Sequence, residues 1–219
     1  MRSLMQYMLL LGNSGGEQYG PEQTLTLQPD AAAGVDSYVQ SNQAATNNAN
    51  GATLYVGEWS GASFVNRSMM QFDLSSIPAN AKIDSATLTL TIVTKNGASV
   101  AGTLGAYRLK REWVENQVTW TVYSTGNNWQ TAGGFGADDC EQTNIGERIL
   151  DPAVLAGTEA LTWTLDAAKV QEWIDGTLTN NGLLLKMATE SDNDFGFASS
   201  DHATASARPK LEVIYRIPF

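Results

Sequence analysis

Short runs in which polar and apolar residues alternate recur along most of this chain, and they constrain its fold more than any other feature. The clearest run spans residues 86–93, where Leu88, Leu90 and Ile92 share one face and threonines share the other. Alternation with a period of two in β-branched and aromatic residues is typical of half-buried strands. The remaining runs lie at 24–27, 35–39, 53–56, 68–74, 103–109, 161–165, 182–187, 195–199 and 210–216.

One segment departs from this pattern and predicts a helix over 167–175. Asp166 is a good N-cap, because its carboxylate can accept hydrogen bonds from free backbone N–H groups. Val170, Trp173 and Ile174 follow at helical spacing, and Gly176 suits the position after the C-cap. Many short strands with one helix indicate an all-β sandwich.

The size and composition of the chain fit a single domain of this kind. It has 219 residues, of which 42% are hydrophobic, which is enough for a core. Residues 12–23 are polar and rich in glycine, so they are typical of a linker. We therefore expect an N-terminal arm and linker at 1–23 and a sandwich domain at 24–219.

The N-terminal arm is apolar, and we expect it to dock on a partner or on its own domain. Arg2 and the apolar run after it resemble a weak signal peptide, but Gln6 and Tyr7 interrupt the run. No stretch reaches the roughly 20 apolar residues that cross a bilayer. The predicted docking residues are Leu4, Met5, Tyr7, Met8, Leu9, Leu10 and Leu11.

Charge and the scarcity of two residue types exclude several classes of protein. The formal net charge is −10 and the basic residues do not cluster, so we expect neither nucleic acid nor a membrane surface as a partner. Cys140 and His202 are the single cysteine and histidine. An internal disulfide and a Cys/His zinc site within the chain are therefore excluded.

Four segments together carry a family resemblance. They are 67–90 (RSMMQFDLSSIP, then AKI and SATLTL), 113–134 (WVENQVTW, then Trp129 and two glycines), 163–185 (WTLDAAKVQEW, then Gly176, Asn181-Gly182 and LLL) and 197–215 (FASSD, then RPKLEVIY). In this order and spacing the chain resembles the DNRLRE domain, also described as a disaggregatase-related or carbohydrate-binding-module-like β-sandwich.

The resemblance implies a jelly-roll-like antiparallel β-sandwich without catalytic machinery. Such modules are commonly attached to secreted enzymes or surface proteins and are thought to bind polysaccharide. The expected fold is thus all-β and jelly-roll-like, with one short helix and an extended N-terminal arm.

Carboxylates are the residues from which catalysis or metal binding would have to come. Asp138, Asp139 and Glu141 lie in a glycine-rich stretch, and Glu112 and Glu115 flank Trp113. A pair of acids could hydrolyse a glycoside, but acid pairs are common in an acidic chain, so we predict that the protein is not an enzyme.

Calcium prefers six to eight oxygen ligands, which loop carboxylates can supply. We name Asp36, Asp138 and Asp139 as calcium ligands, with solvated loop carboxylates as the alternative; no cofactor is required. Asp192 and Asp194 are further candidates, because residues 191–194 resemble the start of a calcium loop but lack its glycine and its final glutamate.

A glycan site would need exposed aromatic rings, which stack on sugar faces. Trp59 lies in a turn-like stretch, GEWSG, outside the family pattern, and it suits either a glycan platform or a subunit contact. Trp129 and Tyr123 flank the 126–128 loop and are the second choice, with a core position as the alternative for Trp129.

Two functions from different classes follow. The first is a non-catalytic accessory subunit of a larger assembly, most plausibly a phage decoration protein of the capsid or tail. Its arm would anchor it to other protein subunits on the virion surface. The alternative is a secreted or cell-surface carbohydrate-binding module that acts as an adhesin on a polysaccharide.

Overall fold

The structure is a computed structural model that describes residues 17–61 and 63–219. Within these residues it contains one α-helix and a series of strands that pair antiparallel throughout. The elements are β1 (Gln23–Leu27), β2 (Val35–Gln40), β3 (Thr53–Trp59), β4 (Phe64–Gln71), β5 (Lys82–Thr94), β6 (Gly102–Arg108), β7 (Val122–Ser124), β8 (Asn127–Asn128), β9 (Gly146–Leu150), β10 (Ala160–Leu165), α1 (Ala167–Ile174), β11 (Leu183–Met187), β12 (Phe195–Ala198) and β13 (Lys210–Arg216).

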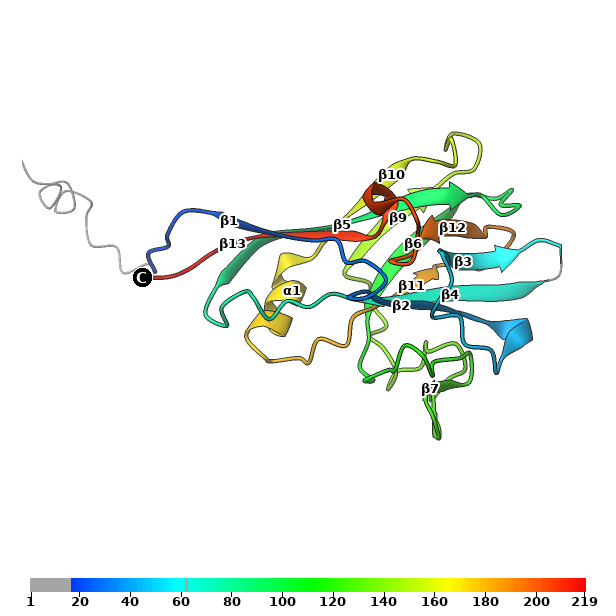
Figure 1. Cartoon of the computed structure of the whole chain (residues 1–219), viewed down its shortest axis with the longest axis horizontal. Coiled ribbons are helices and arrows are strands. Elements are labelled where there is room, and N and C mark those ends of the chain that lie inside the picture. Colours follow the sequence, from blue (N-terminus) through cyan, green and yellow to red (C-terminus); the bar gives the residue numbers. More distant parts are fainter. Residues whose placement is uncertain (1–16, 62) are drawn as a thin grey trace, which may run out of the picture.

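Two layers of strands make up the sandwich (Figure 1). In the first layer, β5 pairs with β10 along one side and with β13 and then β12 along the other, while β1 and β3 extend it. The second layer has the order β2, β4, β11, β6, β9. Because β3 also pairs with β4, the two layers are parts of one curled sheet. The predicted jelly-roll-like β-sandwich is confirmed.

Alternation along β5 builds the main core between the layers. Leu88, Leu90 and Ile92 have no exposed surface, and the threonines between them are only partly covered. Leu88 lies in register between Trp163 of β10 and Leu211 of β13. Each side chain on this face therefore packs against neighbours on both sides, as the period-two pattern predicts.

A second apolar cluster lies on the outer face of the second layer. Residues 109–145, which we call the lobe, leave the sheet after β6 and return at β9, and they carry the small β7–β8 hairpin (Figure 1). Lobe residues pack on side chains that point outward from the sheet. The cluster contains Val39, Met69, Tyr107, Leu109, Trp113, Val118, Trp129, Cys140 and Leu184.

Helix α1 has the caps that the sequence predicts. The Asp166 carboxylate accepts a hydrogen bond from the backbone N–H of Ala168, and Gly176 has a φ of +77° just past the C-cap. Val170, Trp173 and Ile174 are the buried residues of the helix, which packs against β5. The predicted helix at 167–175 is therefore confirmed to within one residue.

Three strand predictions need correction. The run at 68–74 is a strand from Phe64 to Gln71, because the backbone turns where the Ile77 N–H donates to Leu74 O. Trp59 ends strand β3 instead of lying in a turn, since Gly57, with φ +114°, lets the strand continue. Strand β9 was not predicted, because a glycine and two charged residues interrupt the alternation of polar and apolar residues along it.

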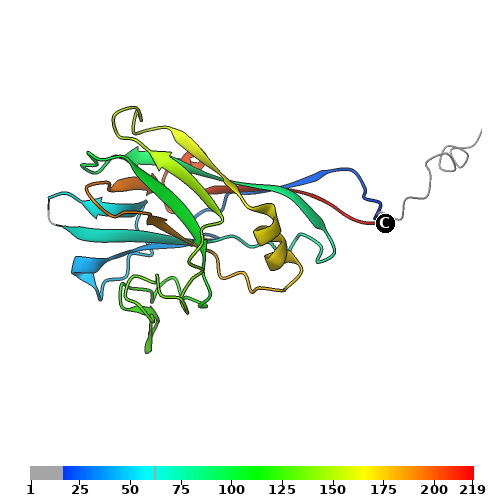
Figure 2. The same ribbon diagram turned by 180° about the vertical axis from the view of Figure 1, so that it is seen from behind.

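The first layer extends beyond the rest of the sandwich as a narrow ribbon of β1, β13 and the start of β5 (Figures 1 and 2). At its tip, residues from both ends of the described chain run side by side. Gly20 N–H donates to Ile217 O, and Phe219 N–H donates to Gln18 O. Residues 17–22, predicted as linker, thus lie against the C-terminal residues. Within the described ranges, no helix is both long and apolar enough to cross a bilayer.

Candidate functional site

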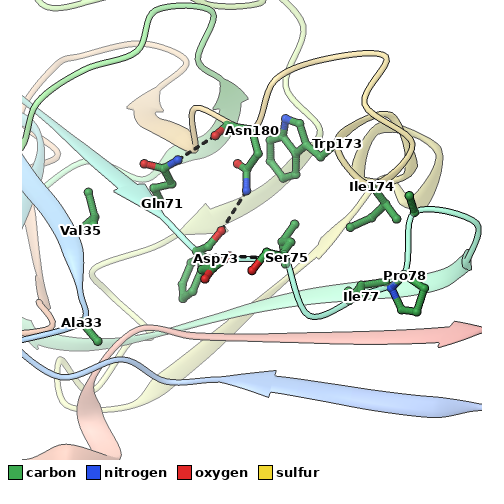
Figure 3. A pocket seen from close by; sticks show the side chains of 13 residues that line it. Ala33, Val35, Gln71, Asp73, Ser75, Ile77, Pro78, Trp173, Ile174 and Asn180 are labelled. Carbon is green, nitrogen blue, oxygen red and sulfur yellow. Dashed lines mark hydrogen bonds between the residues drawn. The ribbon is translucent and has the colours of Figure 1, made fainter.

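An open hollow of about 690 Å³ lies between the end of β4 and the last turn of α1 (Figure 3). A smaller hollow of about 240 Å³ adjoins it towards β1 and shares Ala33, Gln71, Phe72 and Asp73. We call the two together the groove. Its remaining lining residues are Thr26, Leu27, Gln28, Pro29, Val35, Leu74, Ser75, Ile77, Pro78, Ala79, Trp173, Ile174 and Asn180.

Local sequence explains the two kinds of surface in the groove. After β4, alternation continues for a few residues without strand pairing, so Phe72 and Leu74 point into the core while Asp73 and Ser75 stay exposed. The last turn of α1 adds Trp173 and Ile174 to the apolar floor, and Ile77 completes it. The groove thus has an apolar floor and a polar rim.

Hydrogen bonds fix the rim (Figure 3). Gln71 Nε2 donates to Asn180 O at 2.7 Å, and Asn180 Nδ2 donates to Phe72 O at 2.9 Å. The Asp73 carboxylate accepts from the Ser75 N–H at 2.9 Å, and hydrogen bonding to Ser75 lowers the pKa of Asp73. Asp73 is therefore an exposed, ionised acceptor at the mouth of the groove.

Sequence reasoning did not assign these residues to a site. Gln71, Asp73 and Asn180 are far apart in the chain, and Trp173 was expected only in the core. Trp173 is indeed 9% exposed, and its Nε1 is buried without a hydrogen-bond partner. The signal that could have found the site is the turn sequence 73–78, DLSSIP, directly after a strand.

Trp59, the first-choice aromatic platform, lies away from the groove at the tip of the β3–β4 hairpin. Its side chain is 37% exposed and packs against Phe64, with ring centroids 5.3 Å apart. A Cβ at Gly61 or Gly97 would lie 3.3 Å from the indole. The backbones of Gly61 and Gly97 therefore lie against the ring, and about a third of the residue stays exposed to solvent.

Trp129 and Tyr123 lie together in the lobe, with ring centroids 5.4 Å apart. Trp129 is 5% exposed, and its Nε1 donates to Thr119 O at 3.0 Å. Its indole is thus part of the second apolar cluster, as the alternative assignment predicted. Tyr123 is half-buried, and the Arg111 guanidinium lies 5.7 Å from its ring centroid.

Asp36, a predicted calcium ligand, is a buried residue of β2. Its Oδ2 accepts from the Ser200 N–H at 2.8 Å, while its Oδ1 is buried without a partner. Burial, with smaller contributions from the nearby carboxylates of Glu115 and Asp201, raises the pKa of Asp36 to about 6. The carboxyl group is consequently easy to protonate at mildly acidic pH.

Asp138 and Asp139 lie in the lobe and have different roles. Asp139 is fully buried and accepts hydrogen bonds from the N–H groups of Gln130, Thr131 and Gly136. Asp138 is exposed and accepts from Gln130 Nε2. Asp139 therefore organises the loop around it.

The structure does not bring these three carboxylates into one site. Across residues 17–61 and 63–219, no three His, Cys, Asp or Glu side chains gather in a way that could hold a metal ion. Calcium at Asp36, Asp138 and Asp139 stays a prediction. The docking residues predicted in the arm, Leu4–Leu11, lie outside the described residues.

These features define a single all-β sandwich domain with a side lobe and an open groove beside its helix. The chain belongs to the disaggregatase related repeat domain family, whose model matches residues 36–213. The match covers the sandwich from β2 to β13, and it confirms the resemblance seen in the sequence. No curated protein sequence matches the chain.

Proposed function

We propose that this domain is a non-catalytic polysaccharide-binding module and that the groove holds the sugar chain. The observation that carries the proposal is the combination of an apolar floor with a rim of amide and carboxylate groups. Sugars offer apolar ring faces and hydroxyl edges, so a site needs both kinds of surface. The family resemblance, which implies polysaccharide binding, supports the same assignment.

The dimensions of the groove suit part of a chain. Binding sites for small molecules typically measure about 300–1,000 Å³, and the larger hollow of about 690 Å³ falls in that range. The adjoining hollow continues it towards β1. Two adjoining open hollows therefore offer room for more than one sugar ring of a chain.

Charge narrows the class of sugar. The described residues that line the groove include no lysine and no arginine, and Asp73 at the rim is ionised. A uronic acid or a sulfated sugar would meet a carboxylate with no cation to pair with. The ligand is therefore a polysaccharide of neutral sugars or of amino sugars.

The same lining argues for binding over hydrolysis. Glycosidases canonically use two carboxyl groups on either side of the scissile bond. Asp73 is the single carboxylate among the residues that line the groove. We therefore propose recognition without cleavage.

The test is affinity electrophoresis and calorimetry against neutral, amino and uronic acid polysaccharides, with a variant that fills the groove. Ala33 is exposed and lines both hollows, so Ala33→Trp should block the groove without disturbing the core. Ala32→Trp is the matched control, because Ala32 lies in the same exposed turn but does not line the groove.

We expect wild type and Ala32→Trp to bind neutral or amino polysaccharides, and Ala33→Trp to lose at least tenfold in affinity. Binding that survives Ala33→Trp but disappears in Trp59→Ala would move the site to the hairpin tip. Failure of the wild type to bind any of the three polysaccharide classes would refute the function itself.

A second candidate function is that of an accessory subunit in a larger assembly, such as a phage particle. The ribbon favours it, since residue 17 emerges at the ribbon tip, beyond the sandwich (Figure 2). An arm that starts there would hold the sandwich away from its support. In this case the full chain should co-sediment with a particle or oligomer, and a chain that lacks residues 1–16 should remain a folded monomer. A truncated chain that still co-sediments would refute this role.

A further inference from the structure

The amide side chains around the groove donate to the backbone of the protein itself. Gln71 Nε2 donates to Asn180 O at 2.7 Å, and Asn180 Nδ2 donates to Phe72 O at 2.9 Å. In the smaller hollow, Gln28 Nε2 donates to Arg208 O at 3.0 Å. Each of the three amides therefore keeps a single N–H to offer to a ligand.

The acceptors of the same rim are less occupied. The exposed Asp73 carboxylate accepts from Ser75 alone among residues 17–61 and 63–219, with the Ser75 N–H 2.9 Å from Asp73 Oδ1. Lone pairs of its two oxygens therefore remain for a ligand. The amide oxygens of Gln71 and Gln28 are also without a donor in this part of the chain. The rim thus presents free acceptor oxygens, and one of them carries a charge.

No positive charge of the protein balances that carboxylate. The described residues that line the groove include no lysine or arginine, and the ion pairs found among the described residues do not involve Asp73. Hydrogen bonding to Ser75 lowers the pKa of Asp73, so the group stays ionised at mildly acidic pH. A ligand that brings a cation to this point would therefore gain an ion pair without breaking one.

Among the common substituents of sugars, an ammonium group suits this rim best. It carries a positive charge and three N–H donors, as a lysine side chain does. Hydrogen bonds that involve a charged group are roughly twice as strong as those between neutral groups. A hydroxyl group is neutral, and an N-acetylated amine has lost the charge and offers a single N–H.

We propose that Asp73 makes the groove selective for polysaccharides of free amino sugars, whose ammonium group pairs with its carboxylate. This selectivity rests on the proposed function, because it names the class of sugar that the same groove holds. The ring of such a sugar would pack on the apolar floor, to which Ile77 and Trp173 contribute (Figure 3). The remaining N–H groups of Gln71 and Asn180 would donate to its hydroxyl groups.

A test has to separate this local ion pair from the charge of the whole chain. The net charge of −10 attracts any polycation, and Asp73→Asn changes it by a single unit, so that general attraction stays nearly the same. Asp175→Asn is the matched control. Asp175 is also exposed and also accepts from an N–H two residues further on, that of Thr177 at 3.0 Å, but it does not line the groove.

The experiment is calorimetry of the full chain at mildly acidic pH with a glucosamine oligomer and with its N-acetylated counterpart of equal length. We expect the wild type to prefer the free amine form. Asp73→Asn should lower this preference about three- to fivefold, in the upper range for an exposed ion pair. Asp175→Asn and Asp73→Glu should keep it. A rise in ionic strength from about 0.1 M to about 1 M should weaken it, because the Debye length falls from about 10 Å to about 3 Å.

Three results would overturn the selectivity, and they differ in what they leave of the proposed function. A wild type that binds the N-acetylated form or a neutral polysaccharide at least as tightly as the free amine form would leave polysaccharide binding standing. So would an equal preference in Asp73→Asn and Asp175→Asn, which would assign the attraction to the charge of the whole chain. A wild type that binds no neutral, amino or uronic acid polysaccharide would refute the proposed function and the selectivity together.

Discussion

Arg108 on β6 and Glu172 on α1 form an ion pair across the helix–sheet contact, with Arg108 Nη2 2.7 Å from Glu172 Oε2. The guanidinium has no exposed surface, and it also makes two hydrogen bonds to the Glu141 carboxylate. Its remaining nitrogen, Nη1, donates to Lys169 O. One buried cation thus joins β6, the lobe and the helix whose last turn forms the groove floor.

Removal of both acids should harm the fold more than removal of the base. Glu141→Gln with Glu172→Gln leaves a buried guanidinium without a counter-charge, which should lower the free energy of unfolding by about 3–5 kcal/mol. Arg108→Met should cost less, because both acids are partly exposed and water can solvate them. Urea unfolding measures the difference, and a larger loss in Arg108→Met would contradict this account.

The lobe offers a second test through two neighbouring acids. The Asp139 carboxylate accepts hydrogen bonds from three backbone N–H groups, and in Asp139→Asn an amide NH₂ group would face some of these donors. The free energy of opening the lobe should therefore fall by about 1–3 kcal/mol. Asp138→Asn changes an exposed acid and is the control. If the free energy of opening the lobe falls by about 1.4 kcal/mol, the population of molecules with an exposed lobe interior rises tenfold.

Cys140 can report that opening. The thiol is fully buried, and burial raises its pKa to about 12, so it should react slowly with a thiol reagent in the native protein. Asp139→Asn should speed its modification at least tenfold, while Asp138→Asn should leave the rate near that of wild type. Equal rates in the two variants would show that Asp139 does not hold the lobe.

The sequence predicts the sandwich well because alternation is a local signal with one physical cause. Leu88, Leu90 and Ile92 are buried because strand geometry sends alternate residues to one face. The helix was equally predictable, since Asp166 and Gly176 mark its two ends. β9 escaped prediction because its more covered positions are Gly146, Arg148 and Leu150, so only the last of them is an apolar side chain that alternation can reveal.

The groove could not be predicted in the same way. Its rim joins Gln71 and Asn180 through a hydrogen bond between residues 109 positions apart. Its floor uses Trp173, which the local pattern assigns to the core. A site of this kind depends on how the end of a strand meets the end of a helix, and no local spacing encodes that contact.

Alanine substitutions at two glycines should differ in stability, and the difference measures a steric clash at one of them. Gly57 and Gly126 both have a positive φ, +114° and +79°, so alanine at either position destabilises the folded protein because its side chain disfavours a positive φ. A Cβ at Gly57 would also lie 2.2 Å from Asn193 O, whereas a Cβ at Gly126 meets nothing within 4 Å. Thermal unfolding should show Gly57→Ala to be clearly less stable than Gly126→Ala. Equal melting temperatures would mean that the β3 corner relaxes freely.

The raised pKa of Asp36 predicts a pH dependence of stability with a definite sign. Burial raises this pKa from 3.8 to about 6 in the folded state. Between these two values the folded chain holds a proton at Asp36 that the unfolded chain releases, so the contribution of this group to stability falls as pH rises. Asp36→Asn keeps an acceptor for the Ser200 N–H but cannot ionise.

The free energy of unfolding of wild type minus that of Asp36→Asn should therefore decrease from about pH 4 to about pH 6 and stay level above that range. Urea titrations with a chelator present, at several pH values, measure this difference. Asp73→Asn is the control, because the pKa of Asp73 is lowered and its small effect should have the opposite sign. A constant difference between wild type and Asp36→Asn would mean that folding does not raise the pKa of Asp36.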